Sequence, residues 1–159
     1  MTRTVRAVPE HLRTLTVRLV VHDAAAAIDF YVKAFGAQEH GQRHTTPDGK
    51  IVHAEIAIGD SIAFVTDESG DGNGVAPRTV DGRATAIMSI AVPDADAVWN
   101  QAVAAGCSVV YPLADQFYGD RAGRLRDPFG QQWMISTHIE YVSHDEIARR
   151  MRQQFESNS

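Results

Sequence analysis

The residues best suited to chemistry are a histidine and a glutamate two positions apart, His53 and Glu55, within the apolar segment Ile51 to Ile58. This segment predicts a strand, and residues two apart on a strand point to the same face of a sheet. On one face, an imidazole and a carboxylate could act as general base and general acid, or could orient a polar ligand. The same alternation is also typical of a solvent-facing strand, so a purely structural role stays open.

A second cluster of polar and aromatic residues spans Phe117 to Arg121. A tyrosine hydroxyl donates hydrogen bonds and a guanidinium forms paired bonds to a carboxylate, so Tyr118 and Arg121 could hold an anionic or aromatic ligand. In the alternative interpretation, Asp120 and Arg121 cap turns and pair with each other. The candidate ligand-binding residues are Tyr118, Arg121, Phe117, Trp133 and Met134.

Other kinds of active site lack the residues that they need. The single cysteine, Cys107, excludes an intrachain disulfide and has no neighbouring base to activate its thiol, so we expect a small buried hydrophobe. The glycine-rich segment 70–74 lacks the lysine and the strand-to-helix context of a phosphate-binding loop. His40 and His44 alternate with polar residues and are expected to be solvated.

The composition limits the partners. A net charge of −5 argues against a nucleic-acid partner, which would require a basic patch. No segment approaches the ~20 apolar residues of a membrane span, and the first residues lack the apolar region of a signal peptide. We therefore expect a cytoplasmic protein that binds neither nucleic acid nor membranes.

The elements that must position these residues form a duplication. Residues 14–67 and 84–138 each follow the pattern of a βαβββ module. In each module the helix starts after an aspartate, Asp23 or Asp94, and ends at a glycine. One module cannot bury its sheet alone, so two must pair, and we expect function in the cleft between them.

The periodicity also predicts the limits of the elements. The predicted helices are 24–35, 95–105 and 146–155, and the predicted strands are 15–21, 37–44, 51–58, 61–66, 85–92, 108–111, 121–127 and 131–137. Pro112 is expected to end the strand that precedes it, and the Asp127 carboxylate is expected to accept backbone N–H bonds within a turn.

Three segments lie outside the modules. Residues 1–13 form an N-terminal arm, and residues 68–83 form a linker that is either a plain connector or a lid. In the C-terminal segment 141–159, Ser143 is the predicted helix cap, and an apolar seam with four-residue spacing should dock on the domain 14–140 or on a partner subunit.

Two such modules resemble the vicinal oxygen chelate superfamily of glyoxalase I, extradiol dioxygenases and bleomycin-resistance proteins, and especially its PhnB-like branch. The resemblance covers residues 15–150, and it is carried by the segments 23–37, 53–61, 118–125, 127–133 and 143–150. The Asp127-Pro-Phe-Gly turn followed by Trp133 is its most specific marker. The resemblance implies an α+β fold with a curved mixed sheet, a C-terminal helix, a small-molecule pocket between the modules and a homodimer, but no single reaction.

The resemblance also implies where a metal would bind. Enzymes of this superfamily take ligands from the first strand and a later strand of each module. By register these positions fall at Thr16, at His53 or Glu55, at Ile87 and at Met134. Three of the four offer no metal ligand. We therefore expect no metal and no cofactor, with a divalent ion as the lesser alternative.

Three hypotheses for function follow. The first is a metal-independent protein that binds a small molecule in the inter-module pocket, without catalysis. The second is an enzyme of lyase, isomerase or dioxygenase type that uses His53 and Glu55, with or without a divalent metal. The third is a resistance protein that sequesters an aromatic or planar drug in the dimer groove.

Overall fold

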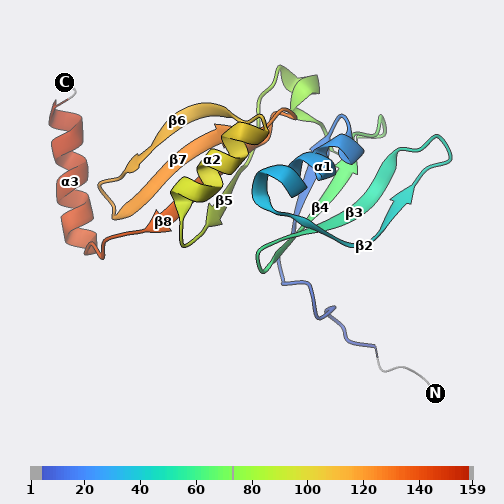
Figure 1. Cartoon of the computed structure of the whole chain (residues 1–159), viewed down its shortest axis with the longest axis horizontal. Coiled ribbons are helices and arrows are strands. Elements are labelled where there is room, and N and C mark those ends of the chain that lie inside the picture. The colour runs from blue at the N-terminus through green and yellow to red at the C-terminus, as the bar shows by residue number, and fades with distance from the viewer. Residues whose placement is uncertain (1–4, 73, 158–159) are drawn as a thin grey trace. The chain divides into compact units, whose positions relative to one another are not determined.

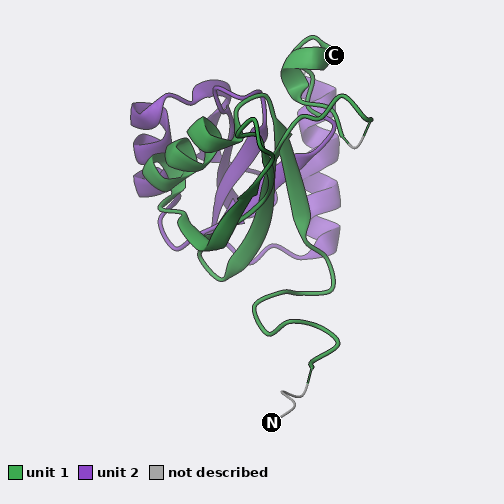
Figure 2. Ribbon diagram, turned by 90° about the vertical axis from the view of Figure 1, so that its right-hand side faces the viewer, with its two compact units in different colours: residues 1–84 green, residues 85–159 purple. Residues whose placement is uncertain are grey.

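The duplication predicted from the sequence is present in the computed structural model, which describes residues 5–72 and 74–157. The chain separates into unit 1, Met1–Ala84, and unit 2, Thr85–Ser159 (Figure 2). The first four residues of the predicted arm and Asn73 of the predicted linker lie outside the described residues. Each unit contains one βαβββ module with its own four-stranded mixed sheet.

The module of unit 1 consists of one α-helix on one sheet (Figure 1). In chain order its elements are β1 (Val17–Val21), α1 (Ala24–Phe35), β2 (Gln38–Thr45), β3 (Ile51–Ile58) and β4 (Ser61–Asp67). The strand order is β1-β4-β3-β2, with β1 parallel to β4 and the other pairs antiparallel. The largest fully buried side chains of this unit are Tyr31, Leu19, Ile28, Ile56, Val21 and Val65.

Local signals fix both ends of α1. The Asp23 side chain accepts a hydrogen bond from the Ala26 amide at 2.9 Å, and Gly36 adopts a left-handed conformation with φ 65°. The Asp67 carboxylate accepts hydrogen bonds from the amides of Ala24 and Ile51, at 2.8 and 2.7 Å. The end of β4 therefore holds the start of α1 and the start of β3 in place.

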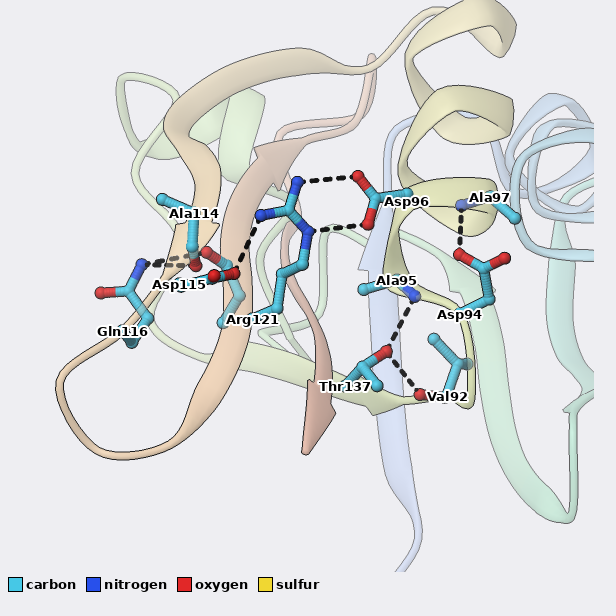
Figure 3. Close-up of polar contacts among 11 residues, drawn as sticks. Val92, Asp94, Ala95, Asp96, Ala97, Ala114, Asp115, Gln116, Arg121 and Thr137 are labelled. Atoms are coloured by element: carbon cyan, nitrogen blue, oxygen red, sulfur yellow. Dashed lines mark hydrogen bonds and ion pairs between the residues drawn. The ribbon is translucent and has the colours of Figure 1, made fainter. Parts of the chain in front are cut away.

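Unit 2 repeats this plan and adds a helix. Its elements are β5 (Ile87–Ala91), α2 (Ala95–Ala105), β6 (Ser108–Asp115), β7 (Asp120–Arg126), β8 (Gln132–His138) and α3 (His144–Ser157). The strand order is β5-β8-β7-β6. Here Thr137 takes the place of Asp67: its hydroxyl accepts from the Ala95 amide at 2.8 Å and donates to the Val92 carbonyl at 2.7 Å (Figure 3).

One predicted element was wrong in its extent. The strand expected to end before Pro112 continues as β6 to Asp115. β6 is an edge strand, and its pairing with β7 shifts register between Tyr111 and Ala114. A proline is tolerated in this position because a bulge on an edge strand does not require its missing N–H.

The linker is partly built into unit 1. It contains a short 3-10 helix, η1 (Pro77–Val80), and both Ala76 and Pro77 are buried. The Glu68 carboxylate accepts hydrogen bonds from the Ala76 amide at 3.1 Å and from the Thr79 hydroxyl at 2.6 Å. This segment therefore has local structure of its own, and both interpretations, a plain connector and a lid, stay predictions.

The helix α3 is held mainly by polar contacts. The Ser143 hydroxyl accepts a hydrogen bond from the Glu146 amide at 3.3 Å, which confirms the predicted cap. Arg150 forms ion pairs with Glu140 at 2.9 Å and with Glu146 at 2.7 Å, and it donates to the Phe117 carbonyl at 3.2 Å. Within the described residues, no helix is both long enough and apolar enough to cross a membrane.

Candidate functional site

The two sheets carry polar side chains at matching positions. In unit 1, Glu55 on β3 pairs with His40 on β2 and with Phe64 on β4. In unit 2, Arg124 on β7 pairs with Tyr111 on β6 and with Met134 on β8. Glu55 and Arg124 each alternate along the strand with buried core residues, so each points away from the core of its unit.

In unit 1, the Glu55 carboxylate lies between two histidines. Its Oε2 atom is 2.9 Å from His11 Nε2 and its Oε1 atom is 3.1 Å from His53 Nε2, and the side chain is only 17% exposed. Burial tends to raise the pKa of Glu55, but the hydrogen bonds from His53 and His11 outweigh it and hold that pKa below its usual value. Glu55 is therefore an anion at neutral pH.

Other rings enclose this carboxylate. The His40 ring stacks on the His11 ring with a centroid separation of 4.3 Å, and the His53 ring meets the edge of Phe64 at 4.8 Å. The possible ligand atoms of His11, His40 and Glu55 all lie within 4.8 Å of one another. We name these three residues the histidine–glutamate cluster.

The structure confirms that His53 and Glu55 share a face, because they form a direct hydrogen bond. Their catalytic role stays a prediction. Sequence reasoning did not find His11 or His40 as their neighbours, since His11 belongs to the arm and the polar pattern of β2 suggested solvation. No local signal in the sequence joins His11 to a residue 44 positions later.

In unit 2, a cavity of about 180 Å³ lies on the sheet. It is lined by Tyr111, Gln116, Tyr118, Ala122, Gly123, Arg124 and Met134. We name it the Arg124 pocket. The Arg124 guanidinium lies over the Tyr111 ring, 5.1 Å from its centroid, in the geometry of a cation–π contact.

Arg124 has an unusual hydrogen-bonding state. Its Nε atom is buried, and within the described chain it is the one buried side-chain nitrogen or oxygen without a hydrogen-bond partner. Buried polar groups in folded proteins are almost always paired, so an unpaired donor beside a cavity requires an explanation, and a bound ligand is one. The sequence offered a signal for this residue, since Arg124 is the charged residue of β7 that lies between the small Gly123 and the apolar Leu125, both of which are buried.

Two further side chains shape the pocket. Burial and the nearby charge of Asp120 raise the pKa of Tyr118, while Arg124 opposes them, so the hydroxyl stays protonated and can donate at neutral pH. The Gln116 amide nitrogen donates to the carbonyls of Ala114 and Ala122, at 3.2 and 3.1 Å, which ties the β6–β7 turn to its strands (Figure 3).

Of the five predicted ligand-binding residues, only Tyr118 and Met134 line the pocket. Arg121 instead forms ion pairs with Asp96 at 2.7 Å and with Asp115 at 2.9 Å (Figure 3). Hydrogen bonds to these two carboxylates raise the pKa of Arg121. The pairing expected in the alternative interpretation was wrong, because Arg121 pairs with Asp96 and Asp115 while Asp120, its predicted partner, pairs with His138.

Trp133 and Phe117 are also not among the residues that line the pocket. Trp133 is 2% exposed, and its indole N–H donates to Asp127 Oδ2 at 2.9 Å. Asp127 Oδ1 accepts from the amides of Phe129 and Gln131 at 2.9 and 3.0 Å, which confirms the predicted turn role. Trp133 is thus a core residue that holds this turn.

The pairing also corrects one assumption about register. By sequence register, Met134 is expected at the position that His53 or Glu55 occupies in the first module. Met134 lies on the last strand of unit 2 and its counterpart in unit 1 is Phe64, because both pair with the strand next to them at the same row. The counterpart of Glu55 is Arg124.

Comparisons with known proteins agree with this architecture. Residues 11–135 match the family described as the Glyoxalase/Bleomycin resistance protein/Dioxygenase superfamily. An uncharacterised protein of Mycobacterium tuberculosis is 41% identical over 143 residues, which are 88% of this chain and 83% of that protein.

Solved structures are similar to the chain as well. TioX from Micromonospora sp. ML1 has 28% identity and a TM-score of 0.61, covering 79% of this chain and 98% of its own. A gene product of Arabidopsis thaliana has 26% identity and a TM-score of 0.62, with the same coverage. A PhnB protein from Bacillus cereus, at 15% identity and a TM-score of 0.58, covers 79% of this chain and 99% of its own and shows the shared fold alone. The predicted fold is therefore confirmed.

Proposed function

Since the chain belongs to the glyoxalase/bleomycin resistance protein/dioxygenase superfamily, we propose that it binds a small anionic molecule in the Arg124 pocket. The single observation that carries this proposal is the buried Arg124 Nε atom without a partner. The bound molecule would carry a carboxylate or phosphate group next to a planar or apolar part.

The charge of the ligand follows from the guanidinium. A buried donor without a partner costs ~1–3 kcal/mol of stability, and arginine cannot lose its proton to relieve that cost. Arg124 forms no ion pair with any described residue, so no carboxylate of the described chain neutralises it. A ligand carboxylate or phosphate would supply both the acceptor and the opposite charge.

The walls favour a ligand with a planar part. The rings of Tyr111 and Tyr118 and the side chain of Met134 offer apolar surface next to the guanidinium. The protonated Tyr118 hydroxyl adds a second donor for an anionic group. A pocket of about 180 Å³ is smaller than the ~300–1,000 Å³ of a site that encloses a drug-sized molecule, so it would take the charged end of a ligand.

This mode of binding does not depend on a metal. None of the seven lining residues is a histidine, cysteine, aspartate or glutamate, the usual protein ligands of transition metals. Recognition would instead rest on the guanidinium, the phenol hydroxyl and the aromatic surface.

A titration followed by amide NMR tests the proposal. Benzoate is the charged probe and benzamide is its neutral match in shape. We expect benzoate to shift the amide signals of the residues that line the pocket, and Arg124→Met to weaken its affinity at least ~tenfold, as loss of a charged hydrogen bond does. Arg126→Met, which changes an exposed arginine on the same strand, is the matched control and should bind benzoate as the wild type does.

Two results would contradict the proposal. One is equal affinity for benzoate and benzamide. The other is unchanged affinity for benzoate in Arg124→Met. The expected homodimer plays no part in the proposed binding and stays a prediction. The molar mass from light scattering, measured as the protein leaves a size-exclusion column, would test it.

The two other hypotheses also stay predictions. Catalysis by His53 and Glu55 would require a free carboxylate or imidazole, but both Glu55 oxygens already accept hydrogen bonds from histidines. Turnover that persists in His53→Ala would refute that role. Sequestration of a planar drug would use the same aromatic walls, so it would also depend on Tyr111.

A further inference from the structure

The histidine–glutamate cluster of unit 1 has a chemistry that the Arg124 pocket lacks. Two imidazoles and a carboxylate place one possible ligand atom each within 4.8 Å of the others. We propose that His11, His40 and Glu55 bind a divalent transition-metal ion such as Zn²⁺. The proposal is independent of the proposed function, since it uses other residues in the other unit.

The backbone prepares two of the three ligands. His40 and Glu55 are paired directly across β2 and β3, so the ladder of the sheet fixes their separation. His11 comes from the arm, within a turn closed by the hydrogen bond from the Leu12 amide to the Pro9 carbonyl, at 3.1 Å. Ligands from two strands and one preceding segment converge on one point, as in metal sites built on a rigid sheet.

The distances require only a small contraction. Ligand atoms that each lie ~2.1 Å from one ion can be at most ~4.2 Å apart, and a tetrahedral ion sets them closer. His11 Nε2 and Glu55 Oε2 are already 2.9 Å apart. The widest separation in the cluster is no more than 4.8 Å, so a rotation of the His40 ring would bring its nitrogen within range.

The ligand types select the class of ion. Imidazole nitrogen with one carboxylate suits Zn²⁺, Co²⁺ or Ni²⁺ better than Mg²⁺ or Ca²⁺, which prefer oxygen ligands. His53 would orient the Glu55 carboxylate, because its Nε2 lies 3.1 Å from the second oxygen. Three protein ligands would leave the fourth position of a tetrahedral ion open to water or a small molecule.

This site differs from the centre that the superfamily's enzymes use. The resemblance points to first-strand and later-strand positions, of which Thr16, Ile87 and Met134 offer no ligand. Only Glu55, on β3, is both such a position and a member of the cluster. The other two ligands come from β2 and the arm, and all three belong to unit 1.

The experiment uses the full chain without a histidine tag, freed of metal with a chelator and then titrated with ZnCl₂ in a calorimeter. We expect one Zn²⁺ per chain. His11→Gln and His40→Gln should each weaken the affinity for Zn²⁺ by at least ~tenfold, and Glu55→Gln by a similar factor. His11 lies outside the sheet, so His11→Gln reports on binding even if a change in β3 impairs folding.

Two control variants show whether Zn²⁺ binds at the cluster or elsewhere on the chain. His144→Gln removes an exposed histidine at the start of α3 and should leave Zn²⁺ affinity unchanged. Arg124→Met should also leave it unchanged, so failure of the benzoate experiment would not affect this result. CoCl₂ should give the intense visible absorption of a four-coordinate ion in the wild type and not in His40→Gln.

The proposal is overturned if no stoichiometric ion binds. It is also overturned if Zn²⁺ affinity survives both His11→Gln and His40→Gln, or falls equally in His144→Gln, since either result would indicate scattered surface histidines.

Discussion

Glu55 and Arg124 occupy the same position in the two units but carry opposite charges. Each lies on the third strand of its module and pairs with one residue on the second strand and one on the fourth. These partners are His40 and Phe64 for Glu55, and Tyr111 and Met134 for Arg124. The carboxylate is surrounded by imidazoles and the guanidinium by phenol rings. The two sites that we propose, for a cation in unit 1 and for an anion in unit 2, thus lie at the same position of one scaffold.

Replacement of Arg124 should cost little stability. The Nε atom has no hydrogen-bond partner, so Arg124→Met removes an unfavourable buried group while it keeps the apolar stem. We expect the free energy of unfolding in urea to change by less than ~1 kcal/mol, or to rise. A loss of more than ~2 kcal/mol would show that Arg124 is structural.

Replacement of Asp127 should be costly. Its buried carboxylate accepts hydrogen bonds from two backbone amides and from the Trp133 indole. Asp127→Ala leaves these donors unpaired, so we expect unfolding in urea to become easier by ~2–4 kcal/mol. Asp60→Ala, at an exposed hairpin of unit 1, is the control and should change stability by less than ~0.5 kcal/mol. Similar effects of the two changes would contradict the role of Asp127.

Cys107 should resist alkylation in the folded protein. Burial and the charge of Asp127 raise the pKa of the Cys107 thiol to about 12, so very little thiolate exists at pH 8. Iodoacetamide should therefore modify Cys107 much more slowly in the native chain than in urea, as followed by mass spectrometry. Equal rates in both states would show that the thiol is accessible and activated.

The same shift predicts a loss of stability at alkaline pH. The thiol of the unfolded chain ionises near its ordinary pKa of ~8.5, while the folded thiol keeps its proton up to about pH 12. The unfolded state therefore binds fewer protons in this range, and stability falls as the pH rises through it. The variant Cys107→Ala should lack this part of the pH dependence; if its urea midpoint falls with pH as steeply as that of the wild type, Cys107 is not the cause.

The ion pairs that hold α3 should weaken at acidic pH. Hydrogen bonds from Arg149 and Arg150 lower the pKa of Glu146 to about 2, and the hydrogen bond from Arg150 lowers that of Glu140. Because the pKa of each carboxyl group is lower in the folded state, its contribution to stability is complete above the ordinary glutamate pKa of ~4.3. This contribution is lost as the pH falls through the pKa of the folded state.

We therefore expect the NMR signals of the α3 amides to shift toward those of Arg150→Gln between about pH 4 and about pH 2. Arg152→Gln, on the same helix but outside the ion pairs, is the control. Signals that stay unchanged down to pH 2 would contradict the ionic attachment.

The helices and strands of both modules, and their order along the chain, could be predicted from local sequence patterns. The helices α1 and α2 have the predicted limits because aspartates and glycines act within a few residues of them, and hydrogen bonds of that range depend on local conformation alone. The shared face of His53 and Glu55 followed from the two-residue period of a strand.

Contacts between residues on different elements could not be predicted in this way. His11 reaches Glu55 over 44 positions, and Arg124 faces Tyr111 only through the shifted register of the edge strand β6, which continues past Pro112. Strand register and the path of an arm depend on the packing of the whole unit, since a shift of one residue would turn every side chain of a strand to the opposite face.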